Sequence, residues 1–257
     1  MNIKASNLSF KYEKKAAKPL LNSLNLEIKE GTVNVLLGLN GCGKTTFVKL
    51  LAGLLKPTDG TILYNGQDLQ KISIRNRAKI FSYVPQKAEV TSDVPVRQYL
   101  SYGVTNTLEF YEHPGKEEMK LVEEVAEKLH ISNLLDKNLG EISGGELQIV
   151  LIACSLIQNT EIMLLDEPTS ALDMKNQSLV LSILKDIAKE QNKTIILSSH
   201  NPNHALFLDS NVILMHEGSI HEEGPAKDLI KVEKLVPVYG EHVCVSKDLG
   251  YEEISFK

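Results

Sequence analysis

Short apolar runs alternate with amphipathic segments along most of the chain. Several runs are almost continuously apolar, which is typical of strands buried on both faces of a parallel sheet. Between them, apolar residues recur at helical spacing, for example at Val122, Val125 and Leu129. Alternating strands and helices predict a layered α/β fold. The predicted strands are Ile3–Phe10, Leu24–Ile28, Val33–Leu37, Ile80–Val84, Ile162–Leu165, Thr194–Ser198 and Val212–Met215.

Residues 88–157 interrupt this alternation. They contain helical patterns and few strand signals, and Pro85 and Pro95 mark their beginning. We interpret them as a helical insertion in the α/β core. At about 150 residues per domain, the 257 residues of the chain allow one large domain, which we place at residues 1–230. Residues 231–257 are expected to form a C-terminal tail.

Composition narrows the class of protein. Hydrophobic residues make up 42% and charged residues 24%, as in ordinary globular proteins. The net charge of −5 argues against a nucleic-acid partner. Cys42, Cys154 and Cys244 have no disulfide or metal-binding spacing, which indicates a reducing compartment. Because no apolar run could cross a bilayer and no signal peptide is evident, we expect a cytoplasmic protein that reaches a membrane only through a partner.

The segment Gly38–Thr45 matches the GxxxxGK[ST] pattern of phosphate-binding loops, between a predicted strand and a helical run. Its glycines let backbone N–H groups face a phosphate, and the helix N-terminus adds positive charge. We expect Lys44 to reach the β- and γ-phosphates of ATP and Thr45 to bind Mg²⁺. The predicted nucleotide contacts here are Gly38, Asn40, Gly41, Cys42, Gly43, Lys44, Thr45 and Thr46.

Cys42 lies within this loop, near Lys44 and a helix N-terminus, both of which lower the pKa of a thiol. Two interpretations stay open. The thiol is either reactive and protected by bound nucleotide, or it is a small residue that fills space.

Two carboxylates, Asp166 and Glu167, follow the apolar strand Ile162–Leu165. Strand side chains alternate between faces, so the two cannot share one role. Asp166 is suited to hold Mg²⁺, and Glu167 can then polarise the attacking water as a general base. A solvated turn is the alternative, and the phosphate loop elsewhere in the chain argues against it.

The segment Ser143–Glu146 reads as a capping box at the start of a helix that runs to about Ile157. A capping box alone explains the serine and the glutamate. The two glycines between them fit a helix start poorly, because each costs about 1 kcal/mol in a helix. They fit better if a large anion approaches the exposed N–H groups.

With these motifs in this order, the chain resembles the ATP-binding subunits of ABC transporters over roughly residues 3–240. The resemblance implies a P-loop ATPase core with a mixed, largely parallel sheet, an N-terminal antiparallel β part and an inserted helical subdomain. Further motifs support it: Ile142–Glu146 resembles the signature, Ser170–Asp173 the D-loop, Gln86 the Q-loop glutamine, His200 the switch histidine and Tyr12 the aromatic residue that stacks on adenine.

The resemblance also implies residue roles. Glu167, His200 and Gln86 would be catalytic, and Gln86 would join Thr45 and Asp166 in binding Mg²⁺. In this family the signature of one subunit caps the γ-phosphate that a second subunit holds. The residues implied to contact that nucleotide across a head-to-tail dimer are Ser143, Gly144, Gly145 and Asp173.

The implied partners are a second copy of the chain, transmembrane permease subunits and, indirectly, a substrate-binding protein. The helical insertion near Gln86 would bind the permease at the cytoplasmic face of the membrane. Finer features, such as Tyr83–Gln86, His200–Ala205 and Val238–Gly240, are similar to importers of iron–siderophore, haem or cobalamin type. Iron–siderophore import is favoured among these cargoes.

Other interpretations remain open at this stage. A soluble ATPase of iron–sulfur cluster assembly or of DNA repair would carry the same nucleotide motifs and bind soluble partners. His200 and His204 have a spacing that occurs in metal sites, but Pro202 lies between them and no third ligand is evident. We therefore expect His204 on a helix near the surface.

Overall fold

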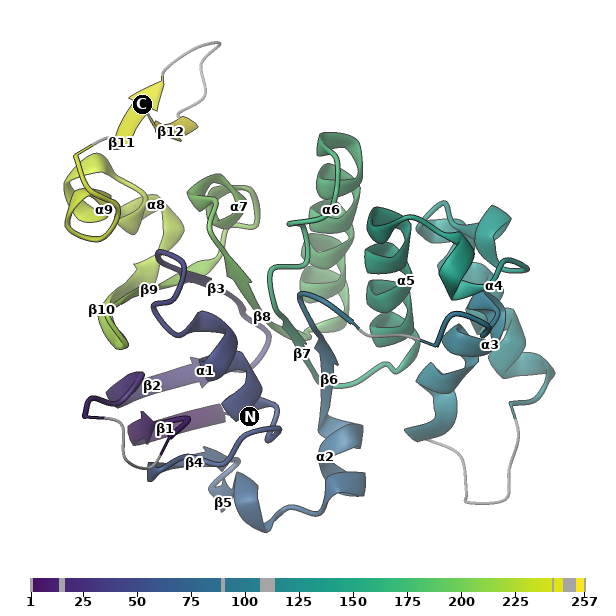
Figure 1. The fold of residues 1–257 in the computed structure, drawn as a ribbon, viewed down its shortest axis with the longest axis horizontal. Helices are drawn as coiled ribbons and strands as arrows, with labels where there is room; N and C mark the ends of the chain where they lie inside the picture. The colour runs from purple at the N-terminus through teal and green to yellow at the C-terminus, as the bar shows by residue number, and fades with distance from the viewer. Residues whose placement is uncertain are drawn as a thin grey trace.

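A six-stranded sheet forms the centre of the protein (Figure 1). Its strand order is β10-β9-β3-β8-β7-β6, and every neighbouring pair is parallel except β9 and β10. The strands are β3 (Val33–Leu37), β6 (Phe81–Val84), β7 (Ile162–Leu165), β8 (Thr194–Ser199), β9 (Asn211–His216) and β10 (Ser219–Pro225). The computed structural model describes residues 2–13, 17–88, 91–106, 114–241, 243–246 and 253–256.

A second, antiparallel sheet is built mainly from the N-terminal part of the chain, in the order β2-β1-β4-β5. Its presence confirms the N-terminal antiparallel β part that the family resemblance implies. Its strands are β1 (Asn2–Phe10), β2 (Leu21–Lys29), β4 (Asp59–Tyr64) and β5 (Gln67–Asp68).

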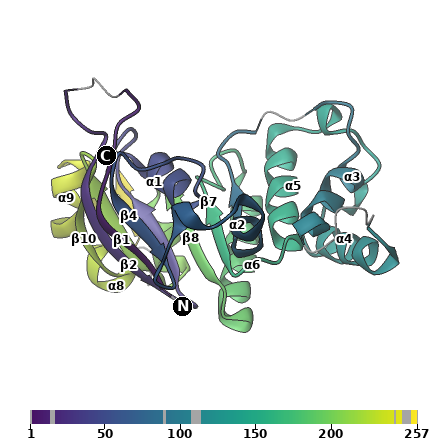
Figure 2. The ribbon, with the colours of Figure 1, turned by 90° about the horizontal axis from the view of Figure 1, so that it is seen from below.

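Helix α1 (Lys44–Leu51) lies between the two sheets (Figures 1 and 2). The alternation of side chains along β3 explains the layers. Leu36 joins the cluster that α1 and the antiparallel sheet share, whereas Val35 and Leu37 face the opposite cluster. That second face is covered by α6 (Met174–Gln191), α7 (Pro202–Phe207), α8 (Ala226–Leu229) and α9 (Val232–Tyr239).

Helices fill most of the chain between β6 and β7 and extend to one side of the sheets (Figure 2). α5 is apolar on nearly all sides and contacts both α3 and α4, which makes it the centre of this helical region. Within the described parts of the chain, no helix is both long and apolar enough to span a bilayer. The helices are α3 (Val96–Ser101), α4 (Lys116–Lys128) and α5 (Gly144–Ile157), with 3₁₀ turns at Tyr102–Asn106, Ser132–Leu134 and Leu139–Glu141, and α2 (Ile74–Ile80) precedes β6.

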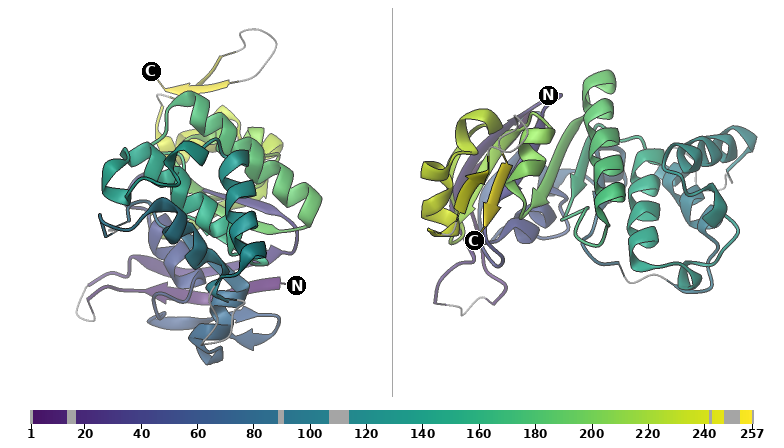
Figure 3. Two further views of the ribbon diagram at one scale, coloured as in Figure 1. Left: turned by 90° about the vertical axis from the view of Figure 1, so that its right-hand side faces the viewer. Right: turned by 90° about the horizontal axis from the view of Figure 1, so that it is seen from above.

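The C-terminal segment packs on the core. Leu235 and Val238 of α9 are buried in the same cluster as the sheet. A hairpin of β11 (Val243–Ser246) and β12 (Glu253–Phe256) follows at one end of the molecule (Figure 3). The Asn203 side chain of α7 donates to the Ile254 carbonyl at 3.0 Å and accepts from its N–H at 2.9 Å. Part of the predicted tail, residues 242, 247–252 and 257, lies outside the described residues.

Candidate functional site

The phosphate loop connects β3 to α1, as the motif requires. Gly43, the residue before the helix, has φ 107°, and Gly38 has φ 151°. A side chain is strained at these angles. It would also collide with its surroundings, since a Cβ on Gly38 would lie 2.3 Å from the Met215 carbonyl oxygen. Glycine is therefore required at both positions for the loop to curl.

Lys44 is held across the mouth of this loop. Its Nζ donates to the carbonyls of Gly38 at 2.8 Å and Leu39 at 3.1 Å, and the side chain is buried. It also lies 4.0 Å from Glu167 Oε1. A cavity of about 430 Å³ opens here, lined by Leu20, Asn40, Gly41, Gly43, Lys44, Thr45, Thr46, Gln86 and Glu167.

Asp166 lies beneath the loop at the end of β7 and is 1% exposed. Its Oδ1 accepts from the Thr45 hydroxyl at 2.9 Å and from the Ser198 hydroxyl at 2.7 Å. A hydroxyl beside a carboxylate fits Mg²⁺, which binds through oxygen ligands and uses one or two carboxylates together with substrate phosphates. Among the described residues no group of three or more His, Cys, Asp or Glu could hold a metal ion, and a site of this kind does not need one.

The three residues predicted to be catalytic, Gln86, Glu167 and His200, lie together, with Glu167 between the other two. Glu167 Oε2 accepts from Gln86 Nε2 at 2.9 Å and lies 3.6 Å from His200 Nδ1. The Glu167 side chain is 12% exposed, whereas that of His200 is 59% exposed. Gln86 follows β6, Glu167 follows β7 and His200 follows β8, so the carboxyl ends of three adjacent parallel strands converge here.

Tyr12 stands beside the same loop. Its hydroxyl lies 3.1 Å from the Thr46 hydroxyl, and its ring meets Phe10 edge to face at 4.9 Å between centroids. The side chain is 63% exposed. An aromatic surface is thus available next to the phosphate loop.

The signature segment forms the capping box that its spacing predicts. Ser143 Oγ accepts from Glu146 N at 3.3 Å, and Glu146 Oε2 accepts from Ser143 N at 2.8 Å. Hydrogen bonding of the Glu146 carboxylate to the Ser143 backbone N–H, and secondarily to the Ser143 side chain, lowers the pKa of the Glu146 carboxyl. Asp173 caps α6 in a similar way, by accepting from Asn176 N at 2.8 Å.

The structure does not bring the signature to the phosphate loop of the same chain. Among the residues that line the loop cavity, as far as the chain is described, Ser143, Gly144, Gly145 and Asp173 do not occur. Gly145 instead lies beside the D-loop, where a Cβ would be 3.1 Å from the Ala171 carbonyl oxygen.

Burial favours the space-filling interpretation of Cys42, and it shows that the surface position expected for His204 is wrong. Cys42 is 7% exposed, and desolvation raises the pKa of its thiol more than Lys44 lowers it. His204 is also 7% exposed rather than near the surface. Its Nδ1 lies 3.0 Å from the Ser199 hydroxyl, and desolvation together with His200 lowers its pKa to about 4.

Two residues at the site were not predicted. Leu20 lines the cavity just before β2, and nothing distinguishes it in the sequence from other apolar residues. Ser198 bonds to the acidic pair from β8. A signal for it does exist, because it is a hydroxyl directly after the apolar run Ile195–Leu197 in a strand that is buried throughout.

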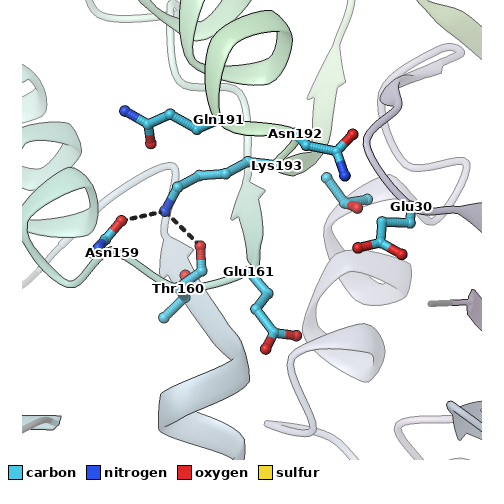
Figure 4. Close-up of a pocket in the computed structure, with 8 residues that line it drawn as sticks. Glu30, Asn159, Thr160, Glu161, Gln191, Asn192 and Lys193 are labelled. Carbon is cyan, nitrogen blue, oxygen red and sulfur yellow. Dashed lines mark hydrogen bonds between the residues drawn. The ribbon is translucent and has the colours of Figure 1, made fainter.

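A separate cavity of about 570 Å³ lies where β7 and β8 begin, at the other end of the sheet (Figure 4). Lys193 is its buried cation, and its Nζ donates to Asn159 Oδ1 and to the Thr160 carbonyl, both at 2.7 Å. Burial lowers the pKa of this ammonium group. Lys193 thus ties the loop before β7 to the loop before β8.

Comparison with known proteins agrees with this geometry. A family model described as ABC transporter matches residues 21–170. A probable iron chelatin transport ATP-binding protein of Helicobacter pylori is 34% identical over 218 residues, which are 84% of this chain and 84% of that protein.

Two solved structures share the fold. An inward-facing putative metal-chelate type ABC transporter superposes with a TM-score of 0.81 at 25% identity, over 99% of this chain and 97% of that chain. The dimeric structure of a bacterial ABC transporter cassette gives a TM-score of 0.81 at 25% identity, over 87% of this chain and 98% of that chain.

Proposed function

Since the chain belongs to the family of ABC transporter ATP-binding proteins, we propose that it hydrolyses ATP to power a membrane importer of an iron–siderophore or a related metal chelate. One observation carries the hydrolytic part. The Glu167 carboxylate is held between Gln86, His200 and Lys44 at the mouth of the phosphate loop. The cargo class is supported by relatives whose names specify iron chelatin and metal-chelate transport.

In this proposal the loop binds ATP through its backbone N–H groups, and Lys44 turns from the loop carbonyls to the β- and γ-phosphates. Glu167 accepts the proton of the attacking water. Gln86 orients that water, and His200 contacts the γ-phosphate. Thr45, Asp166 and Gln86 are the oxygen ligands available to Mg²⁺, which neutralises phosphate charge when bound. Tyr12 stacks on the adenine.

The active unit in this proposal is a head-to-tail dimer. The signature residues do not line the loop cavity of their own chain, so they are free to meet nucleotide held by a second copy. Ser143, Gly144, Gly145 and Asp173 are the residues assigned to that contact. A dimeric cassette of the same fold supports this arrangement.

The permease is proposed to dock in a groove between the helical region and β6. This groove has a volume of about 370 Å³, and Pro85 and Ala88, on either side of Gln86 in the sequence, help to line it, which would link docking to the catalytic residues. We place the chain on the cytoplasmic face of the membrane through this contact, with a substrate-binding protein as an indirect partner. The groove is lined by Tyr83, Pro85, Ala88, Thr91, Val94, Tyr99, Tyr102, Leu139, Leu151, Cys154, Ser155 and Gln158.

Two measurements test the proposal. The first is affinity purification of the chain from detergent-solubilised native membranes, with mass spectrometry of its partners. A stoichiometric polytopic membrane protein is expected, and soluble partners alone would favour a cluster-assembly or repair ATPase. The second is uptake of radioactive iron supplied as a siderophore by cells that carry only Glu167→Gln. Uptake at the wild-type rate would contradict the importer assignment.

A further inference from the structure

We propose that Ser198 is a positioning residue that holds Asp166 and the backbone of Glu167 in their working places. The inference rests on the proposed function, because it assumes that these two carboxylates act on Mg²⁺ and on the attacking water. It assigns a role in the reaction to a side chain that does not line the nucleotide cavity.

The topology places Ser198 opposite the acidic pair. β8 lies beside β7, and Leu197 pairs with Leu165, the last residue of β7. Ser198 and Asp166 directly follow this pair in the sequence, so they lie side by side. Ser198 is completely buried, so its hydroxyl is directed at protein partners rather than at water.

One hydroxyl bonds to both acidic residues. Ser198 Oγ donates to Asp166 Oδ1 at 2.7 Å and accepts from the Glu167 N–H at 2.8 Å. Asp166 Oδ1 also accepts from Thr45, so the serine belongs to a chain of hydrogen bonds that runs from the phosphate loop to the Glu167 backbone. An alanine would leave the partly buried Glu167 N–H without this partner and would remove one of the two hydrogen bonds that the buried Asp166 Oδ1 accepts, and losing such bonds in a part-dry environment is costly.

The Glu167 backbone needs such support. Its φ is 45°, in the left-handed region that residues with a Cβ adopt only at a cost. Ser198 holds the Glu167 N–H. The Glu167 carbonyl accepts from Ser170 N at 3.1 Å and from Ser170 Oγ at 3.0 Å. If Glu167 relaxed to a negative φ, its carboxylate would move relative to Gln86 and His200.

The test uses the purified full chain and compares Ser198→Ala, Ser198→Cys and Ser198→Thr. Alanine removes the hydroxyl, cysteine fills similar space with a weak hydrogen-bonding group, and threonine keeps the hydroxyl. Ser210→Ala is the matched control, because Ser210 is also buried and its Oγ donates to the Ala205 carbonyl at 3.1 Å, just before β9. The readouts are kcat and KM for MgATP, ATP affinity in the absence of Mg²⁺, and the melting temperature.

We expect Ser198→Ala and Ser198→Cys to lower kcat by about tenfold to a hundredfold, the loss that a small misplacement of reacting groups causes. KM and Mg²⁺-free ATP affinity should stay within about threefold of wild type, because the phosphate loop is intact. Ser198→Thr should retain most of kcat, and Ser210→Ala should keep wild-type kcat. These expected changes in kcat and KM follow because the substitutions displace the two carboxylates and leave the groups that bind ATP in place.

A kcat within twofold of wild type for both Ser198→Ala and Ser198→Cys would overturn the inference. So would a fall in kcat for Ser210→Ala as large as that for Ser198→Ala. Failure of the proposed function gives a different result, since the wild-type chain would then hydrolyse no more ATP than Glu167→Gln does.

Discussion

Glu167 depends on residues that are far apart in the sequence. Gln86 lies 81 positions before it, and their hydrogen bond forms only because β6 and β7 are neighbours. The exposed His200 reaches the same carboxylate from the end of β8. Groups on three strands therefore fix one carboxylate at the edge of the nucleotide cavity.

Replacing Glu167 by glutamine removes the proposed general base with little change in shape. We expect ATP hydrolysis to fall by about a hundredfold or more, because proton transfer by a positioned base contributes this much. ATP binding should persist, since the phosphate loop is unchanged. Phosphate release and nucleotide binding measure the two effects.

Glu161→Gln is the matched control for this change. Glu161 lies just before β7, as Glu167 lies just after it, and accepts from the Tyr64 hydroxyl at 2.6 Å. It is expected to keep wild-type hydrolysis. Equal rates for Glu167→Gln and Glu161→Gln would show that Glu167 is not the base.

His204 makes the stability of the fold depend on pH. Its pKa is lowered from 6.5 to about 4, so the folded chain holds it neutral. The stability that neutral His204 contributes to the fold is complete above pH 6.5. It is lost as the pH falls towards 4, because over this interval the unfolded chain binds a proton that the folded chain does not.

Between pH 7.5 and 5, the loss from this one group is about 2 kcal/mol. His204→Gln has no proton to gain, so its free energy of unfolding should fall by about that much less over the same interval. Urea unfolding of both proteins at the two pH values measures the difference. Parallel losses in the two proteins would refute the assignment.

Sequence reasoning reached the residues whose role follows from spacing and missed the effects of burial. Lys44, Asp166 and Glu167 were predicted because a strand followed by a loop fixes where they lie. The raised pKa of the Cys42 thiol and the buried state of His204 depend on which distant segments cover them. No local pattern carries that information.

Whole elements show the same contrast between what the local sequence determines and what packing against distant segments determines. β7 was predicted because its four residues form a continuous apolar run, and all four are buried in the structure. β4 and β10 were missed because most of their positions are exposed or only partly buried, which leaves no continuous apolar run. Each is paired antiparallel with a better-covered strand, and that pairing stabilises it.

Helix α5 offers a test at the scale of an element. Its reciprocal bonds between Ser143 and Glu146 satisfy N–H groups that a helix start leaves free. Glu146→Ala should lower the free energy of unfolding by about 1 kcal/mol, the net contribution of one hydrogen bond. Glu146→Gln should lose less, because glutamine serves at the same place in a capping box. Urea unfolding at neutral pH measures both, and equal losses would mean that the box does not stabilise the helix.

At the scale of the whole molecule, the phosphate loop and the signature lie on different parts of the fold. The loop begins α1 between the sheets, whereas the signature begins α5 in the helical region (Figure 2). A single chain can therefore bind nucleotide without its own signature. In the proposed head-to-tail dimer, closure around ATP is a property of two chains, and the free energy for it would come from the contacts that each chain makes with the nucleotide bound to its partner.

The dimer can be tested without unfolding the signature helix. Aspartate and asparagine cap helices about as well as serine does, but only aspartate places a negative charge against the γ-phosphate of a partner. In the Glu167→Gln chain with MgATP, we expect a dimer in analytical ultracentrifugation. Adding Ser143→Asp should leave monomers, whereas Ser143→Asn should retain far more dimer. ATP binding to the single chain should be equal in all three, since Ser143 does not line the loop cavity. Dimers of undiminished stability with Ser143→Asp would place the signature away from the second nucleotide.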